Sequence, residues 1–426
     1  MPCRPWPAPM PAAFRRLPSP PGDPLRTSAL LYPWDVVGDP DAARRLADLG
    51  LRQVALASAY HSTRALTPRH PERRIVSARH FAVYYPPDPA RWSGRALRPT
   101  PQGWVPSTDA FEEAASALRS AGISVHSWVV LAHNSLLGSL YPRVTVRNAY
   151  GDHYPWAPCI AQQEVLDYCV DLAAEAAPRP GTDGTDLESC GWYGLAHLHA
   201  HDKISGVPLG PSAQYLMSLC FCADCGRGYR EAGADPAVLR AAVRSALEPI
   251  WREEPRRPAP AGRAEEWQEV RRLLGADLAE ATLAHRARTA RDFQQTVVSA
   301  VRAAARPDFR IMLHADPAGH RYGANPGVDL DHILQVADGL VLPCSGSAED
   351  RAEVLRAAAA HRRPGRVLAA NLTVVSGMGG RPAELASLAR EVAALGADEL
   401  RLYHAGLASD NDLAQVRAAL QERPAL

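Results

Sequence analysis

The stretch Phe309–Cys344, "FRIMLHADPAGHRYGANPGVDLDHILQVADGLVLPC", contains the repeating unit that decides the fold. It begins with a short apolar run, continues through a glycine-rich loop and a helical segment, and ends in a second apolar run. Two such runs joined through a helix are typical of parallel strands with a crossover helix. The stretch therefore indicates an α/β protein.

The same unit recurs along most of the chain. Eight short apolar runs follow one another from residue 28 onward, separated by helical segments or long loops, and no GxGxxG follows the first run. This pattern predicts a (β/α)8 TIM barrel over residues 26–426 rather than an open doubly wound sheet. Residues 59–110 and 189–305 exceed the minimal unit. The second of these segments is mostly helical and carries a cysteine cluster; it is either a pocket-building insertion after strand four or a small domain without a catalytic role.

Composition excludes some classes of partner. The formal net charge is +1, and no block of basic residues alternates with aromatic ones, so we predict no binding to nucleic acid or to a membrane surface. The most apolar window, 127–141, is too short to span a membrane. Residues 1–25 are rich in proline and lack the apolar core of a secretory signal, so we expect a disordered leader. A cytoplasmic protein is predicted, and a homo-oligomer is left open.

Residues at the carboxyl ends of the strands are the candidates for substrate binding, because barrel enzymes build their sites there. The set combines aromatic faces with carboxylates and imidazoles. Sugar rings stack on aromatic faces and their hydroxyls pair with polar groups, so the set suits a small carbohydrate. The predicted substrate-binding residues are Trp34, Tyr60, His61, His126, Trp128, Trp192, His197, His199, Lys203, His314, Asn371, Tyr403 and His404.

Glu188 is the candidate general acid. It ends the fourth strand and is followed by Trp192 and Tyr193, whose aromatic surface would exclude water and keep the carboxyl protonated to higher pH. The alternative is a structural role, either a salt bridge to the barrel wall or a cap of the next helix. A glycosidase needs a second carboxyl group. Asp316 and Asp35 are the available partners, and the proximity of strands four and five favours Asp316.

Three histidines alternate in the segment after strand four, at positions 197, 199 and 201. On an extended chain their rings would point the same way. Such a run is compatible with a metal site, with a substrate clamp or with a polar loop of no function. We favour the interpretation that one or two of the rings contact the substrate.

Cys220, Cys222 and Cys225 have a C-x-C-x2-C spacing that lets three thiolates share one ion. Zinc would need a fourth ligand from elsewhere in the chain. With four thiolates the ion would have no open position and would serve structure rather than chemistry. The candidates for the fourth ligand are Cys159, Cys169 and Cys190.

Three segments, "PCIAQQEVLDY", "DGTDLESCGWYG" and "LCFCADCGRGYREAG", together resemble the central part of the barrel in glycoside hydrolase family 42 β-galactosidases, over roughly residues 155–230. The resemblance implies that Cys159 completes the structural zinc site and that Glu188 is the acid/base residue. Two positions differ from the family. Leu187 stands where the family has asparagine, and Asn371 ends strand seven where the family has its nucleophilic glutamate.

Three alternative functions are compatible with these observations. The first is a glycoside hydrolase with Glu188 as acid. The second is a lyase or isomerase acting on a sugar or sugar acid, with His314, His404 or Lys203 as base. The third is a carbohydrate-binding barrel without catalytic activity.

Overall fold

The computed structural model describes residues 25–196, 202–204, 206–207, 209–252 and 260–422. Of the predicted disordered leader only Leu25 belongs to this part of the chain, so residues 1–24 lie outside the described residues. His197 and His199 lie outside it as well.

Eight parallel strands close into a barrel, which confirms the predicted fold. The first strand pairs with both the second and the last, so the sheet has no open end among these eight. Their residues are almost all buried, because each strand is covered by helices on one side and by the barrel interior on the other. The strands are β1 (Arg26–Leu31), β2 (Gln53–Tyr60), β6 (Ser124–Val130), β9 (Gly184–Glu188), β10 (Arg310–His314), β11 (Gly339–Pro343), β12 (Val367–Thr373) and β13 (Glu399–Tyr403).

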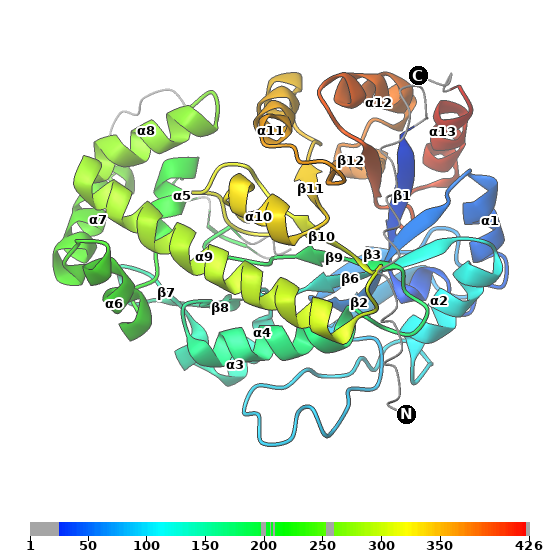
Figure 1. Cartoon of the computed structure of the whole chain (residues 1–426), viewed down its shortest axis with the longest axis horizontal. Helices are drawn as coiled ribbons and strands as arrows, with labels where there is room; N and C mark the ends of the chain where they lie inside the picture. Colours follow the sequence, from blue (N-terminus) through cyan, green and yellow to red (C-terminus); the bar gives the residue numbers. More distant parts are fainter. Residues whose placement is uncertain (1–24, 197–201, 205, 208, 253–259, 423–426) are drawn as a thin grey trace, which may run out of the picture.

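Each barrel strand leads to a helix of the outer layer (Figure 1). Several of these helices begin at a side-chain cap: Asp109 accepts a hydrogen bond from the backbone N–H of Glu112, and Ser347 and Ser409 form capping boxes. The outer helices are α1 (Ala42–Asp48), α2 (Ala110–Ser120), α4 (Gln163–Ala176), α9 (Ala276–Ala304), α10 (Leu330–Val336), α11 (Ala348–Ala360), α12 (Leu385–Ala394) and α13 (Asp410–Gln421).

Three segments extend beyond the minimal barrel. The excursion after β2 contains a two-stranded hairpin and a short strand that pairs antiparallel with β2: β3 (Thr63–Leu66), β4 (Ile75–Ala78) and β5 (Ala82–Val83). The described part of the insertion after β9 contains four helices before α9: α5 (Pro211–Met217), α6 (Ala223–Glu231), α7 (Pro236–Trp251) and α8 (Arg263–Leu274). In Figure 1 these four helices gather on one side of the barrel.

The third segment is one that the sequence pattern did not separate from the barrel unit. It follows β6 and contains α3 (Ser135–Leu140) and a hairpin of β7 (Thr145–Arg147) and β8 (His153–Pro158). Four single-turn 3-10 helices complete the described elements: η1 (Pro33–Asp35), η2 (Pro142–Val144), η3 (Ser376–Met378) and η4 (Pro382–Glu384).

Charged side chains cross the barrel interior below the strand ends. The Arg401 guanidinium donates to Asp186 at 2.8 Å and to Glu399 at 2.8 Å, and all three residues are buried. His126 pairs with the other oxygen of Asp186 at 2.9 Å. Burial alone would raise the pKa of Asp186, but Arg401 and His126 hold it well below its ordinary value. Asp186 and Arg401 therefore stay charged at neutral pH, whereas burial lowers the pKa of His126.

Replacing Arg401 by alanine is expected to destabilise the barrel by about 3–5 kcal/mol, because two carboxylates would keep their burial and lose their shared cation. Urea unfolding followed by circular dichroism measures the change. Arg44→Ala is the control, since this arginine pairs with Asp41 and Asp48 on the exposed face of α1 and should contribute nothing measurable. Equal stability of the two variants would contradict the interpretation.

Candidate active site

A cavity of about 1440 Å³ lies at the carboxyl ends of the barrel strands. Six of the predicted site residues line it: Tyr60, His61, Glu188, His314, Asn371 and Tyr403. They come from β2, β9, β10, β12 and β13 or directly follow these strands, so the closed barrel brings together residues that are far apart in the sequence. This is the position at which (β/α)8 barrels place their substrates.

Glu188 is a buried carboxyl group that borders this cavity. Its side chain accepts a hydrogen bond of 2.9 Å from the indole N–H of Trp128. The phenol groups of Tyr60, Tyr193 and Tyr403 lie close enough to interact with it electrostatically. Burial raises the pKa of Glu188 to about 7, and the Trp128 hydrogen bond offsets this only in part. The group can therefore hold a proton near neutral pH and give it up.

His314 and Asn371, at the strand ends, each have one buried polar atom without a hydrogen-bond partner among the described residues. These atoms are Nε2 of His314 and Oδ1 of Asn371. Burial lowers the pKa of His314 to about 4, so its ring is neutral at physiological pH. A neutral imidazole and an amide that border the same cavity as Glu188 can pair with hydroxyl groups of a ligand.

One wall of the cavity is formed by the rings of His61, His133 and Tyr193. From the sequence, His61 is predicted as a substrate-binding residue and Tyr193 only as aromatic surface after Glu188, whereas His133 is missed. His133 stacks on Tyr193 with ring centroids 4.2 Å apart, and its ring lies 4.8 Å from that of His61. His133 and Tyr193 follow the ends of β6 and β9 by three and five residues, so a prediction restricted to strand ends omits His133. Their signal in the sequence is an aromatic residue soon after a barrel strand.

The two carboxylates proposed as partners of Glu188 do not line the cavity. Asp316 is buried and accepts three hydrogen bonds of 2.9 to 3.0 Å from the guanidinium of Arg263, the first residue of α8. Asp35 is buried as well and accepts a hydrogen bond of 2.8 Å from the backbone N–H of Tyr32. Apart from Glu188, Asp350 on α11 is the carboxylate among the described residues that line the cavity.

Other predicted substrate residues belong to the protein interior. Trp34 and His404 each stack on Tyr32 at 4.3 Å and are fully buried. Burial lowers the pKa of His404 to about 3, so it is uncharged. The indole N–H of Trp192 donates to the backbone carbonyl of Arg286 on α9. These rings pack the structure around the cavity without lining it.

His126, Trp128 and Lys203 also lie outside the cavity lining. His126 belongs to the charged network inside the barrel, and Trp128 contacts Glu188 from below the cavity. His126 and Trp128 face the barrel interior, as the alternation of side chains along the strand predicts. They do not reach the cavity, because the interior extends below the strand ends where the cavity lies. Lys203 is exposed to solvent.

The cysteine cluster forms as the family resemblance implies. The Sγ atoms of Cys159, Cys220, Cys222 and Cys225 all lie within 4.8 Å of one another, and Cys159 is 3.6 Å from Cys225 and 3.8 Å from Cys222. An ion bound tetrahedrally at about 2.3 Å separates its four sulfur ligands by about 3.8 Å. The donor set and its spacing therefore fit zinc. The other candidate ligands, Cys169 and Cys190, are buried elsewhere.

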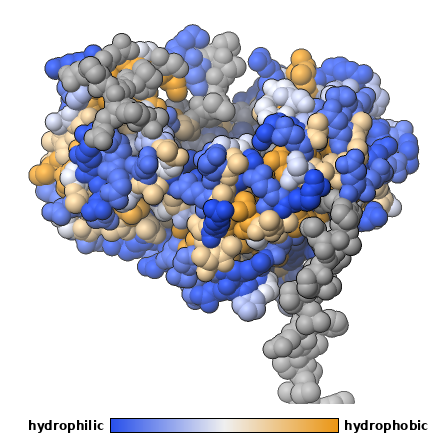
Figure 2. Space-filling model, turned by 90° about the horizontal axis from the view of Figure 1, so that it is seen from above, coloured by the Kyte–Doolittle hydropathy of each residue, from blue (hydrophilic) through white to orange (hydrophobic). Residues whose placement is uncertain are grey.

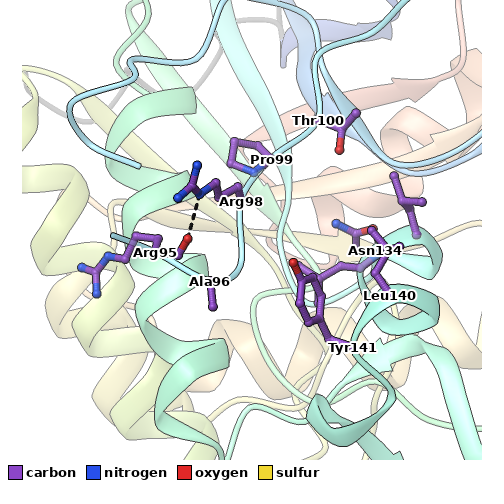
Figure 3. Close-up of a pocket in the computed structure, with 10 residues that line it drawn as sticks. Arg95, Ala96, Arg98, Pro99, Thr100, Asn134, Leu140 and Tyr141 are labelled. Carbon is purple, nitrogen blue, oxygen red and sulfur yellow. Dashed lines mark hydrogen bonds between the residues drawn. The ribbon is translucent and has the colours of Figure 1, made fainter. Parts of the chain in front are cut away.

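A smaller cavity of 460 Å³ lies between residues 95–100 and α3 (Figure 3). It contains none of the predicted site residues, and the Arg98 guanidinium donates to the carbonyl of Arg95 at 2.7 Å beside it. Its lining combines aliphatic and arginine side chains with Thr100, Asn134 and Tyr141, and it has no carboxylate among the described residues. We therefore regard the larger cavity as the candidate active site.

Hydrophilic residues cover most of the face shown in Figure 2. In the part of the chain that the structure describes, the helices lack the combination of length and hydropathy that a membrane span requires.

Comparison with known proteins supports the fold assignment. No protein-family model and no curated protein matches the chain. Solved structures do. An α-L-fucosidase from Paenibacillus thiaminolyticus aligns with a TM-score of 0.53 at 11% identity, over 93% of this chain and 49% of the fucosidase. The PgaB (BpsB) glycoside hydrolase domain from Bordetella bronchiseptica aligns with a TM-score of 0.53 at 15% identity, over 95% of this chain and 99% of that domain.

A third similar structure comes from the family that the sequence resembles. Gan42B, a GH42 β-galactosidase from G. stearothermophilus, aligns with a TM-score of 0.52 at 12% identity, over 93% of this chain and 56% of the galactosidase. The chain thus spans about half of the fucosidase and of the galactosidase. At these identities the likeness establishes the fold alone, which is a (β/α)8 barrel.

The raised pKa of Glu188 predicts a pH-dependent difference in stability between the wild type and Glu188→Gln. The native carboxyl binds its proton up to about pH 7, whereas the ordinary value is 4.5. The stability that this proton contributes is therefore complete below pH 4.5 and is lost as the pH rises to about 7. Relative to the variant, the wild type should lose about 3 kcal/mol across that interval. Urea unfolding of both proteins from pH 4 to pH 8 measures it, and a constant difference would contradict the assignment.

Proposed function

We propose that the protein is a glycoside hydrolase that acts on a carbohydrate, with Glu188 as the general acid. One observation carries the proposal: Glu188 is a buried carboxyl group with a pKa near 7 that borders a large cavity at the carboxyl ends of the barrel strands. A general acid must hold a proton at the working pH and deliver it to the leaving-group oxygen.

The surroundings of Glu188 support this role. The Trp128 indole occupies one oxygen and fixes the orientation of the carboxyl group. The neighbouring phenols of Tyr60, Tyr193 and Tyr403 have raised pKa values because they are buried, so they stay neutral and do not compete as charged groups. Aromatic faces around a carboxyl group also suit the ring of a sugar.

We propose Asp350 as the second carboxylate. Its side chain is about half exposed, which keeps it accessible to a water molecule, and it borders the same cavity as Glu188. A base that activates water, opposite a protonated acid, corresponds to an inverting glycosidase. Asp316 is a weaker candidate because it does not border the cavity and accepts three hydrogen bonds from Arg263. Asp350 lies 3.9 Å from the same guanidinium and accepts one hydrogen bond from the backbone N–H of Ser347.

The lyase or isomerase alternative has less support. Of its three proposed bases, His404 and Lys203 do not border the cavity. His314 does, but its lowered pKa makes it a weak proton acceptor at neutral pH. The alternative of a barrel without catalytic activity is separated from a hydrolase by the activity measurements below.

We further propose that the four cysteines bind zinc for a structural purpose. Four thiolates complete a tetrahedral coordination shell and leave no position for a substrate. A cytoplasmic location and the lack of nucleic-acid binding remain predictions from the sequence, as does the division into a leader, a barrel and an insertion. A homo-oligomeric state stays open.

Replacing Glu188 by glutamine is expected to lower kcat/KM by about 10²- to 10⁴-fold on glycosides with a poor leaving group, because the proton donor is lost. The loss should be much smaller for 2,4-dinitrophenyl glycosides, whose leaving group departs without a proton. A panel of aryl glycosides of the common sugars, assayed with both classes of leaving group, measures the difference.

Glu175→Gln is the matched control for this experiment. Glu175 is also a buried glutamate that accepts a hydrogen bond from an indole N–H, that of Trp92 at 2.8 Å, but it does not border the cavity. Folded Glu175→Gln protein should keep the wild-type rate. Equal losses in both variants, or an equal loss on both classes of leaving group, would rule out the role of Glu188 as general acid.

Elemental analysis of the purified protein is expected to find one zinc ion per chain. Cys225→Ala should lower this content and the melting temperature together, because the removal of one of four ligands weakens the site. Cys169→Ala is the control, since Cys169 is equally buried but lies outside the cluster. A metal content that stays the same in both variants would exclude the cluster as the binding site.

A further inference from the structure

The hairpin of β3 and β4 brings two arginines to the cavity. Arg64 pairs with Ser77 in the antiparallel register, while Ala65 and Val76 are buried on the other face. Because side chains alternate along a strand, Arg64, Ser77 and Arg79 share the exposed face. All three border the large cavity. The hairpin therefore contributes a cationic wall to it.

Within the described residues, the arginines of this wall lack the ion pairs that the other arginines of the cavity form. Two other arginines border the cavity, and both are paired: Arg263 with Asp316, and Arg321 with Glu266. Among the ion pairs of the described residues, by contrast, neither Arg64 nor Arg79 takes part in one. Extension of the hairpin register places these two arginines at diagonal positions, roughly 7 Å apart.

Two unpaired guanidinium groups at this separation repel each other, and they attract an anion that can lie between them. Guanidinium groups bind carboxylate and sulfate or phosphate oxygens in a fork geometry, with two N–H donors aligned to two oxygens. A neutral sugar needs no such pair, and an amino sugar would be repelled by it.

The wall is continuous with the candidate catalytic centre. Residues 60 to 64 all border the cavity in sequence order, from Tyr60 near Glu188 to Arg64 on the hairpin. Four residues of extended chain span about 13 Å. A group bound by Arg64 and Arg79 would thus lie on a part of the ligand away from the bond that Glu188 would protonate.

We propose that the substrate is an anionic glycan, whose carboxylate or sulfate group binds Arg64 and Arg79 while the glycosidic bond lies beside Glu188. The proposal rests on the proposed hydrolase function and adds the substrate class to it. Uronic acids and sulfate esters present the same oxyanion chemistry to the two arginines.

Binding to a glycan array tests the proposal without requiring turnover. The array holds uronic-acid, sulfated, neutral and amino-sugar oligosaccharides, and the full-length Glu188→Gln protein serves as the probe, so that bound glycans persist. Binding is expected to be confined to anionic members, and the relative response of uronic acids and sulfate esters identifies the source of the charge. Their affinity should fall about tenfold on replacement of Arg64 and Arg79 by glutamine, because charge-assisted hydrogen bonds are lost. It should also fall between 50 and 200 mM NaCl, because salt screens exposed charges.

Arg52→Gln is the control, because Arg52 is an exposed arginine that immediately precedes β2 at the opposite end of that strand from the cavity. It should leave the affinity unchanged. Binding confined to neutral or amino sugars, no binding of any anionic member, or anionic binding that survives the double substitution would overturn the proposal. Binding or hydrolysis of a neutral glycan would leave the hydrolase function standing, whereas the absence of both binding and hydrolysis for every glycan would count against that function as well.

Discussion

The ion pair between Arg401 and Asp186 crosses the closed barrel, and the arrangement above it depends on this contact. Four steps around the sheet separate β13 from β9, so the two residues come from opposite sides of the eight-stranded barrel. Their contact at 2.8 Å places two charged side chains in the buried interior of the barrel. A buried carboxylate without its cation would be very unfavourable, so the pairing also constrains how the two strands align. Glu188 lies two residues beyond Asp186 on the same strand.

The two carboxyl groups of β9 show how one strand supports two different roles. Each has a partner on β6: His126 for Asp186, and Trp128 for Glu188. The spacing is two residues on both strands, so the two contacts are successive repeats of one interstrand geometry. Asp186 also has a cation, and its pKa is lowered, while Glu188 has a neutral donor, and its pKa is raised. Divergent pKa values in neighbouring carboxyl groups are the pattern expected where one is structural and the other transfers a proton.

The sequence predicts what depends on local periodicity. The eight strands, the position of Glu188 at the end of one of them and the three-cysteine spacing all follow from patterns within a few residues. The depth at which a side chain lies within the barrel does not follow from such patterns. Alternation places His126 inside the barrel but cannot tell the interior from the cavity, because this depends on the stagger between strands. The engagement of Asp316 by Arg263 depends on a helix 53 residues earlier in the chain, and no local pattern encodes it.

The insertion connects the cysteine cluster to the cavity wall. On one side, the backbone N–H of Arg147 donates to the sulfur of Cys220, so the cluster is tied to the β7–β8 hairpin as well as to Cys159. On the other side, Arg263 holds α8 against Asp316 of the barrel. Gln214, on α5 between these two points, borders the cavity. Cys220 follows the last residue of α5 by only three positions, so a metal ion that fixes the cluster would also fix α5. A structural ion can in this way determine the shape of the cavity without taking part in the chemistry.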